Sequence, residues 1–263
     1  MTRSQTELPS APEAIEDQPL GGGPLRTVSL FGDVSCHDSE MADPSVECLQ
    51  GDVWKFVDDV GLHLVRTYYD QASGFSGSRF DRFAGGGDSP EHRNEFTSED
   101  IVAVTLLEMT VPGNTSLALL ERDPATFNQL LFDVPVEVDL WDASDEIVGP
   151  DSPAANLWSR LMEFPGMGWV TTSKLLARKR PRLLPVYDTV VQAALQPESD
   201  TFWIPLRNEL QDARLRERLR EIRDQADVDD RVALLRILDV AIWMRNRRAS
   251  RCKLDFTPRR PSS

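Results

Sequence analysis

Two glycines, Gly166 and Gly168, stand one residue apart between two segments that have the residue spacing of helices. Glycine tolerates backbone angles that other residues avoid, so Pro-Gly-Met-Gly predicts a tight turn joining two helices over about 153–178. A helix that begins directly after such a turn points its free N–H groups and its dipole at whatever lies over the turn, which suits a phosphate. The segment from Phe164 to Val191 therefore carries most of the functional prediction.

Helix signals also dominate the rest of the chain. Thr97 with Asp100 three residues later has the pattern of a capping box, and Pro124 and Pro153 suit the first position of a helix. Helical spacing predicts further helices over about 49–67, 97–109, 116–121, 170–178, 189–195 and 203–224, and one opened by Asp229 and Asp230. The alternating segment 134–140 is a weak strand candidate because it contains a proline. We therefore expect a mainly α fold with at most a minor strand pair.

Composition separates the chain into three parts. Residues 1–45 are rich in proline, glycine, serine and acids and are predicted to be largely disordered. We expect a single helical domain over 46–247 and a flexible basic tail over 248–263. No apolar run approaches about 18 residues, and the three cysteines and three histidines have no ligand spacing. The sequence thus predicts a cytoplasmic protein with no membrane contact, metal or other cofactor.

Charge is distributed unevenly along the chain. Residues 1–150 carry a net charge of −20 and residues 151–263 a net charge of +6. An acidic chain binds polyanions poorly, because phosphate contacts depend on lysine and arginine. The basic run Arg178-Lys179-Arg180 nevertheless suits a phosphate backbone, or else a solvated helix end where the helix dipole favours cations. DNA is therefore a candidate partner, and a protein partner is not identified.

The hairpin region resembles a known element of DNA repair proteins. The sequence Leu-x-x-Phe-Pro-Gly-Met-Gly-x-x-Thr, ending at Thr171, is similar to the helix-hairpin-helix, and Pro185 to Val191 is similar to the segment that places an Asp in the DNA glycosylase superfamily. The resemblance implies that the hairpin grips a DNA phosphate and that Asp188 stabilises an oxocarbenium-like sugar or orients water. It implies nucleic-acid contacts at Gly166, Gly168, Thr171, Lys174, Arg178, Lys179 and Arg180.

One departure from this pattern concerns the catalytic lysine of the bifunctional glycosylases. The matching position is Val170, so an imine with the sugar, and strand cleavage by that route, are not expected there. Lys174 lies one helical turn later, about 6 Å along the axis, and is predicted to be a phosphate contact or a solvated charge. Asp188 also has a simpler interpretation as a helix N-cap. Only Cys252 follows Asp188, so no iron-sulfur cluster is expected.

A longer resemblance spans about residues 65–245. Tyr68-Tyr69-Asp70, Arg79-Phe80-Asp81 and the segment Gly168 to Pro181 are similar to a family of uncharacterised bacterial proteins, a domain of unknown function. Three hypotheses follow: a helix-hairpin-helix protein that binds a nucleic-acid backbone, a monofunctional N-glycosylase that uses Asp188, or a non-enzymatic protein-interaction module. A glycosylase needs side chains that stack a flipped base. The candidates, if they are not core residues, are Trp141, Trp158, Trp169 and Trp203.

Overall fold

The computed structural model describes residues 48–197 and 202–254, with side chains up to Arg247. These residues all lie in one compact unit of the chain, Phe31–Ser263. The segment 1–45, for which we expect disorder, lies outside the described residues. Of the tail predicted to be flexible over 248–263, residues 248–254 belong to the last helix and residues 255–263 lie outside the described residues. None of the described helices is both long enough and apolar enough to span a membrane.

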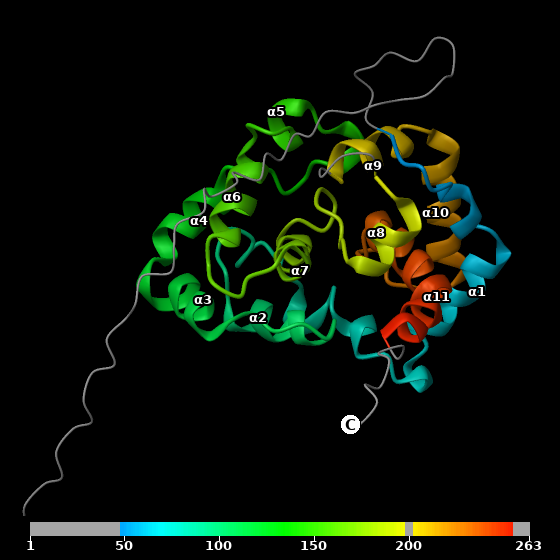
Figure 1. The fold of residues 1–263 in the computed structure, drawn as a ribbon, viewed down its shortest axis with the longest axis horizontal. Coiled ribbons are helices and arrows are strands. Elements are labelled where there is room, and N and C mark those ends of the chain that lie inside the picture. The colour runs from blue at the N-terminus through cyan, green and yellow to red at the C-terminus, as the bar shows by residue number, and fades with distance from the viewer. Residues whose placement is uncertain (1–47, 198–201, 255–263) are drawn as a thin grey trace, which may run out of the picture. The chain divides into compact units, whose positions relative to one another are not determined.

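The prediction of a mainly α fold is confirmed (Figure 1). The α-helices are α1 (Asp59–Tyr69), α2 (Ser98–Thr105), α3 (Gly113–Leu117), α4 (Pro124–Phe132), α5 (Asp145–Val148), α6 (Pro153–Met162), α7 (Trp169–Lys179), α8 (Thr189–Leu195), α9 (Trp203–Leu210), α10 (Ala213–Gln225) and α11 (Leu234–Leu254). Short 3-10 turns are η1 (Val53–Phe56), η2 (Gln71–Ser73), η3 (Ser76–Arg79), η4 (Phe83–Gly85) and η6 (Leu140–Asp142), and α3 continues as a π-helical turn, η5 (Ala118–Arg122).

Helix starts follow the capping signals of the sequence. Thr97 and Asp100 form both hydrogen bonds of a capping box at the start of α2. Aspartates that cap helices also divide two segments for which the sequence predicts continuous helices. Asp58 accepts a hydrogen bond from the Gly61 N–H and begins α1, and Asp212 accepts one from the Arg214 N–H and begins α10. The predicted helices over 49–67 and 203–224 are therefore each two elements.

The alternating segment 134–140 forms no strand in the described structure. Its polar backbone groups pair outside any ladder: the Val134 carbonyl accepts a hydrogen bond from the Arg180 side chain, and the Leu140 N–H donates to the Arg182 carbonyl. An isolated antiparallel bridge joins Leu49 and Pro197. With a proline in the segment and no adjacent strand, period-2 alternation alone is insufficient to build a sheet.

Two helices dominate the packing that builds the site. α11 packs against α1, α8 and α10, and Figure 1 shows α8 and α11 next to one another. α7 packs against α2 and α6, and every residue from Thr171 to Lys179 is buried. A helix buried all round usually carries apolar side chains, but α7 is rich in threonine, serine, lysine and arginine. Its polar groups must therefore find partners inside the protein.

Candidate functional site

The turn between α6 and α7 uses its two glycines differently. Gly166 has φ +80°, in the left-handed region that favours glycine, whereas Gly168 has φ −89° in extended backbone. Gly168 is the N-cap of α7, and no side chain caps the helix there. Both glycines are exposed, while Met167 between them is buried. The turn thus leaves the first N–H groups of α7 free of side-chain partners at the surface.

We expect alanine to lower the free energy of unfolding more at Gly166 than at Gly168. At Gly166 an added Cβ would have room, 3.4 Å from Pro112, but the positive φ makes Gly166→Ala cost about 1 kcal/mol of unfolding free energy. At Gly168 nothing lies within 4 Å of the added Cβ and φ is ordinary, so Gly168→Ala should cost less than about 0.5 kcal/mol. Urea unfolding of the two variants measures the difference, and equal losses would contradict the backbone assignment.

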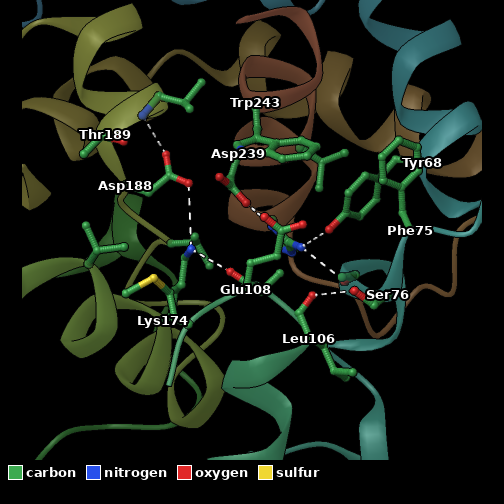
Figure 2. A pocket seen from close by; sticks show the side chains of 18 of the residues that line it. Tyr68, Phe75, Ser76, Leu106, Glu108, Lys174, Asp188, Thr189, Asp239 and Trp243 are labelled. Carbon is green, nitrogen blue, oxygen red and sulfur yellow. Dashed lines mark hydrogen bonds and ion pairs between the residues drawn. The ribbon is translucent and has the colours of Figure 1, made fainter. Parts of the chain in front are cut away.

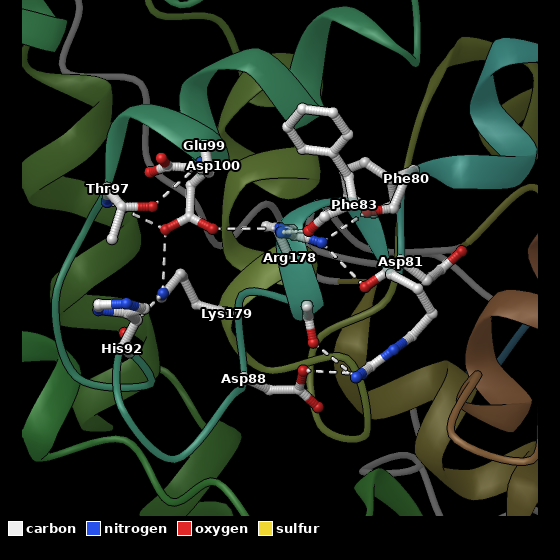
Figure 3. A network of polar contacts seen from close by, with 12 residues as sticks. Phe80, Asp81, Phe83, Asp88, His92, Thr97, Glu99, Asp100, Arg178 and Lys179 are labelled. Carbon is white, nitrogen blue, oxygen red and sulfur yellow. Dashed lines mark hydrogen bonds and ion pairs between the residues drawn. The ribbon is translucent and has the colours of Figure 1, made fainter.

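The basic run at the end of α7 is interior. Arg178 and Lys179 are 2% and 0% exposed and share the Asp100 carboxylate, at 3.1 Å from Arg178 Nε and 3.0 Å from Lys179 Nζ (Figure 3). Arg178 also donates to the backbone carbonyls of Phe80, Asp81 and Phe83, and Lys179 donates to that of His92. These two cations attach the 80–92 segment to α7.

Arg180 is fully buried as well. Its guanidinium donates to the carbonyls of Leu131, Val134, Arg93 and Lys179 and to the side-chain oxygen of Asn94. Burial among these neutral acceptors lowers its pKa to about 10. Neither a surface phosphate nor a solvated helix end fits the positions of Arg178, Lys179 and Arg180, because their donors are used inside the fold. Thr171 is also buried.

A pocket of about 480 Å³ lies between α7, α8, α11, the segment 106–109 and the segment 74–77. Lys174 and Asp188 lie at one end of it, Tyr68 and Phe75 lie at the other, and Asp239 and Trp243 lie between them (Figure 2). The charged lining is formed by Lys174, Asp188, Arg236 and Asp239 together with Glu108. Of these five residues, only Lys174 and Asp188 are candidate site residues from the sequence.

The two carboxylate oxygens of Asp188 have different roles, one in capping a helix and one in lining the pocket. Its Oδ1 accepts the N–H groups of Val190 and Val191, each at 3.0 Å, which confirms the predicted N-cap of α8. Its Oδ2 faces the other way and lies 3.9 Å from Lys174 Nζ (Figure 2). The cap fixes the orientation of the carboxylate, and the second oxygen is left for whatever occupies the pocket.

Lys174 is buried rather than solvated, so the expectation of a solvated charge is wrong. Its side chain is 8% exposed, and Nζ donates to the Leu107 carbonyl at 3.0 Å. Burial lowers the pKa of Lys174, and Asp188 opposes that change. Lys174 follows Val170 by one turn, and both residues line the pocket.

Arg236 and Asp239 of α11 form a second polar group in the pocket. The Arg236 guanidinium contacts Asp239, lies 3.3 Å from Asp81 and donates to the Tyr68 hydroxyl at 2.7 Å. One guanidinium cannot balance two buried carboxylates, so burial raises the pKa of Asp81 and raises that of Asp239 to about 7. The sequence signal for this pair is that two charged residues interrupt the apolar run of the last helix.

The aromatic lining of the pocket consists of Tyr68, Phe75 and Trp243. Tyr68 and Phe75 stack with ring centroids 5.2 Å apart, and Trp243 meets both edge-on. The guanidinium of Arg247 lies over Phe75, 4.7 Å from the ring centroid. These rings add flat apolar surface to the lining of the pocket.

The tryptophans that the sequence offered as base-stacking candidates lie elsewhere. Trp158 and Trp203 pack edge-on against one another at 5.6 Å, Trp169 packs on Tyr187 at 5.0 Å, and Trp141 lies under the Arg216 guanidinium. All four pack against the hydrophobic core. The tryptophan of the pocket is Trp243, whose role the helical spacing of α11 did not reveal.

Comparisons with known proteins place the chain in a family but attach no activity to it. In the described part of the chain, no group of three or more His, Cys, Asp and Glu side chains could hold a metal ion. No curated protein and no solved structure matches the chain. The comparisons lend no support to the glycosylase resemblance, which stays a prediction. Residues 62–246, more than half of the chain, match the family of unknown function DUF6308, and the chain therefore belongs to that family.

Proposed function

We propose that the pocket is the active site of a hydrolase that cleaves the N-glycosidic bond of a nucleotide unit in DNA, with Asp188 as the catalytic carboxylate. The observation that carries the proposal is the divided carboxylate of Asp188. One oxygen is held by two N–H groups of α8, and the other faces a pocket that also contains an aromatic wall. A carboxylate fixed in this way costs no reorganisation when charge develops beside it.

The proposed reaction needs a group that stabilises a cationic sugar and a group that supplies a proton. As the bond from C1′ to the base nitrogen breaks, its electron pair goes to the base, and the Asp188 carboxylate stabilises the oxocarbenium-like sugar. Water then adds to C1′ and gives a proton to Asp188. The departing base takes a proton from Asp239, whose pKa of about 7 suits proton transfer at neutral pH.

The aromatic wall supports a planar leaving group. Tyr68, Phe75 and Trp243 line the pocket that Asp188 faces, and base-flipping enzymes hold the extruded base by stacking and by polar contacts to its edge. The cavity volume of about 480 Å³ lies in the range of pockets that hold small ligands. A nucleobase is therefore a ligand class that this pocket accommodates.

The hairpin supports a polymeric substrate. Val170 lies in the first turn of α7 and lines the pocket, so the uncapped start of α7 is within one helical turn of it. A phosphate over Gly166 and Gly168 would receive N–H groups and the positive end of the helix dipole. A net charge of −14 predicts weak non-specific binding to DNA. We therefore expect the hairpin and the pocket to supply the contacts that hold the substrate.

We expect purified protein to release free bases from DNA and Asp188→Asn to reduce the rate by about 100-fold or more, because a positioned acid–base group contributes on that scale. The substrates are alkylated, deaminated and oxidised duplex DNA, and released bases are measured by liquid chromatography and mass spectrometry. Asparagine preserves the cap of α8, so folding should be kept. The matched control is Asp212→Asn, which changes another helix-capping aspartate outside the pocket.

The outcomes separate the candidate functions. Base release that survives Asp188→Asn would contradict the assignment of Asp188, and no release from any of the three DNAs would contradict hydrolysis. A second candidate, backbone binding without catalysis, is favoured by the exposed glycines and the uncapped α7. It predicts retention of labelled DNA at low salt that weakens as salt rises, with no base released. Absence of retention would oppose both.

A further inference from the structure

Lysine is rare in this chain. The sequence holds 25 arginines and four lysines, at positions 55, 174, 179 and 253. Buried ion pairs here mostly use arginine, as at Arg178 and Arg236. Arginine stays protonated under nearly all conditions and is a poor nucleophile, whereas a buried lysine can lose its proton and react. A lysine that faces the pocket in such a chain therefore points to chemistry that arginine cannot perform.

The two buried lysines of α7 differ in how their amines are held. Lys179 Nζ has two close partners, the His92 carbonyl at 2.8 Å and Asp100 at 3.0 Å, and it lies outside the pocket. Lys174 Nζ has one close partner, the Leu107 carbonyl at 3.0 Å, and its nearest carboxylate is 3.9 Å away. Lys179 is therefore fixed as a structural cation. The amine of Lys174 is held more loosely, at the edge of a space that a ligand can enter.

The four charged groups around Lys174 come from three parts of the chain: α8, α11 and the segment that follows α2. Asp188 of α8, Asp239 of α11 and Glu108 after α2 raise the pKa of Lys174, whereas Arg236 of α11 lowers it. Burial is the strongest influence, and the resulting pKa is lower than that of a solvated lysine. The neutral amine is therefore more abundant at Lys174 than at an exposed lysine at the same pH. The carboxylates of Asp188 and Asp239 lie in the same pocket and are the proposed proton acceptor and donor (Figure 2).

We propose that Lys174 is an amine nucleophile that forms an imine with the carbonyl carbon of an aldehyde bound in the pocket. The Nζ lone pair attacks the carbonyl carbon, and the carbonyl oxygen takes a proton from Asp239 to become a hydroxyl. Nitrogen loses a proton to Asp188, and Asp188 passes that proton to the hydroxyl, which leaves as water while the nitrogen lone pair forms the C=N bond. The N–H proton of the resulting iminium returns to Asp239. Amine and aldehyde are thereby converted to imine and water, with no change in oxidation state.

The absence of a lysine at position 170 does not exclude imine chemistry in this pocket. Imine chemistry is not expected at the position of Val170, but Val170 and Lys174 line the same pocket one turn apart. The inference does not depend on base hydrolysis, because the test supplies aldehydes directly. Open-chain sugars and small aromatic aldehydes are the ligand classes that match a pocket lined by both carboxylates and aromatic rings.

The test is reductive trapping on the folded full-length protein at pH 7. Glycolaldehyde or benzaldehyde is added with sodium cyanoborohydride, which delivers hydride to the imine carbon and leaves a stable secondary amine. Peptide mass spectrometry then gives the labelling rate at each lysine. We expect Lys174 to label about tenfold faster than exposed Lys55, because the pocket holds the aldehyde beside Nζ, and Lys179, which is buried outside the pocket, to label slowest.

A variant and an internal control complete the experiment. Lys174→Arg keeps the positive charge but has no reactive amine, so the fast label should vanish while thermal unfolding confirms a folded protein. Buried Lys179 serves as the control within the wild-type chain. Labelling of Lys174 no faster than that of Lys55, or only after unfolding, would overturn the proposal. Selective labelling without base release would contradict the proposed base hydrolysis but not the imine. Base release without selective labelling would contradict the imine but not base hydrolysis.

Discussion

Replacing Asp100 with alanine is expected to lower the free energy of unfolding by about 3–5 kcal/mol. The Asp100 side chain is 1% exposed and accepts hydrogen bonds from Arg178 Nε and Lys179 Nζ. It also closes the capping box of α2 by accepting the Thr97 N–H at 3.1 Å. Its removal would leave two buried cations without their carboxylate, which costs more than the loss of an exposed ion pair.

Replacing Asp100 should destabilise the neighbouring loop as well as break the two ion pairs. Arg178 and Lys179 hold the backbone carbonyls of residues 80–83 and 92, so loosening them frees the loop that covers one side of α7 (Figure 3). The matched control is Glu99→Ala in the same helical turn, where the side chain is exposed and a change below about 0.5 kcal/mol is expected. Urea unfolding at pH 7 measures both. Similar losses for the two variants would show that the buried carboxylate is dispensable.

The helices that the sequence predicted best are those marked by local signals. The capping box at Thr97, the prolines that open α4 and α6, and the Asp188 cap of α8 each act within a few residues. Boundaries failed where a second cap lay inside a helical pattern, as at Asp212. Spacing of apolar residues continues across such a break, so only the cap identifies it.

The position of α7 in the fold could not be read from its sequence. Its polar composition resembles that of a solvent-facing helix, yet Arg178 and Lys179 meet Asp100 from 78 and 79 residues away. The composition of the pocket could not be predicted from local sequence either. Asp188 and Lys174 both belong to the hairpin-to-Asp segment that the sequence singles out, whereas Asp239 and Trp243 join them only because α11 packs on α8. Tertiary partners decide whether a charge is solvated or buried, and composition does not specify them.

Asp239→Asn is expected to remove a large part of the pH dependence of stability. In the folded protein burial raises the pKa of Asp239 from 3.8 to about 7, against the opposing influences of Arg236 and Lys174. The native state therefore binds a proton more tightly than the unfolded state. This contribution to stability is fully present below about pH 4 and is lost as pH rises to about 7. One pKa unit corresponds to about 1.36 kcal/mol, so the contribution is on the order of 2–4 kcal/mol.

Asparagine at position 239 is neutral at every pH and close in shape to the protonated acid. Between pH 4 and pH 8 the stability of Asp239→Asn relative to wild type should therefore increase by on the order of 2–4 kcal/mol. Arg236 retains Asp81 as a partner in the variant, so it does not become an unpaired buried cation. Urea unfolding at intervals of half a pH unit measures this, with Asp151→Asn as the control for removing an exposed carboxylate. A stability difference that is constant across this range, or that grows against the variant as pH rises, would show that Asp239 is already ionised in the folded protein at pH 4. The proton that it gives to the departing base in the proposed mechanism would then be missing.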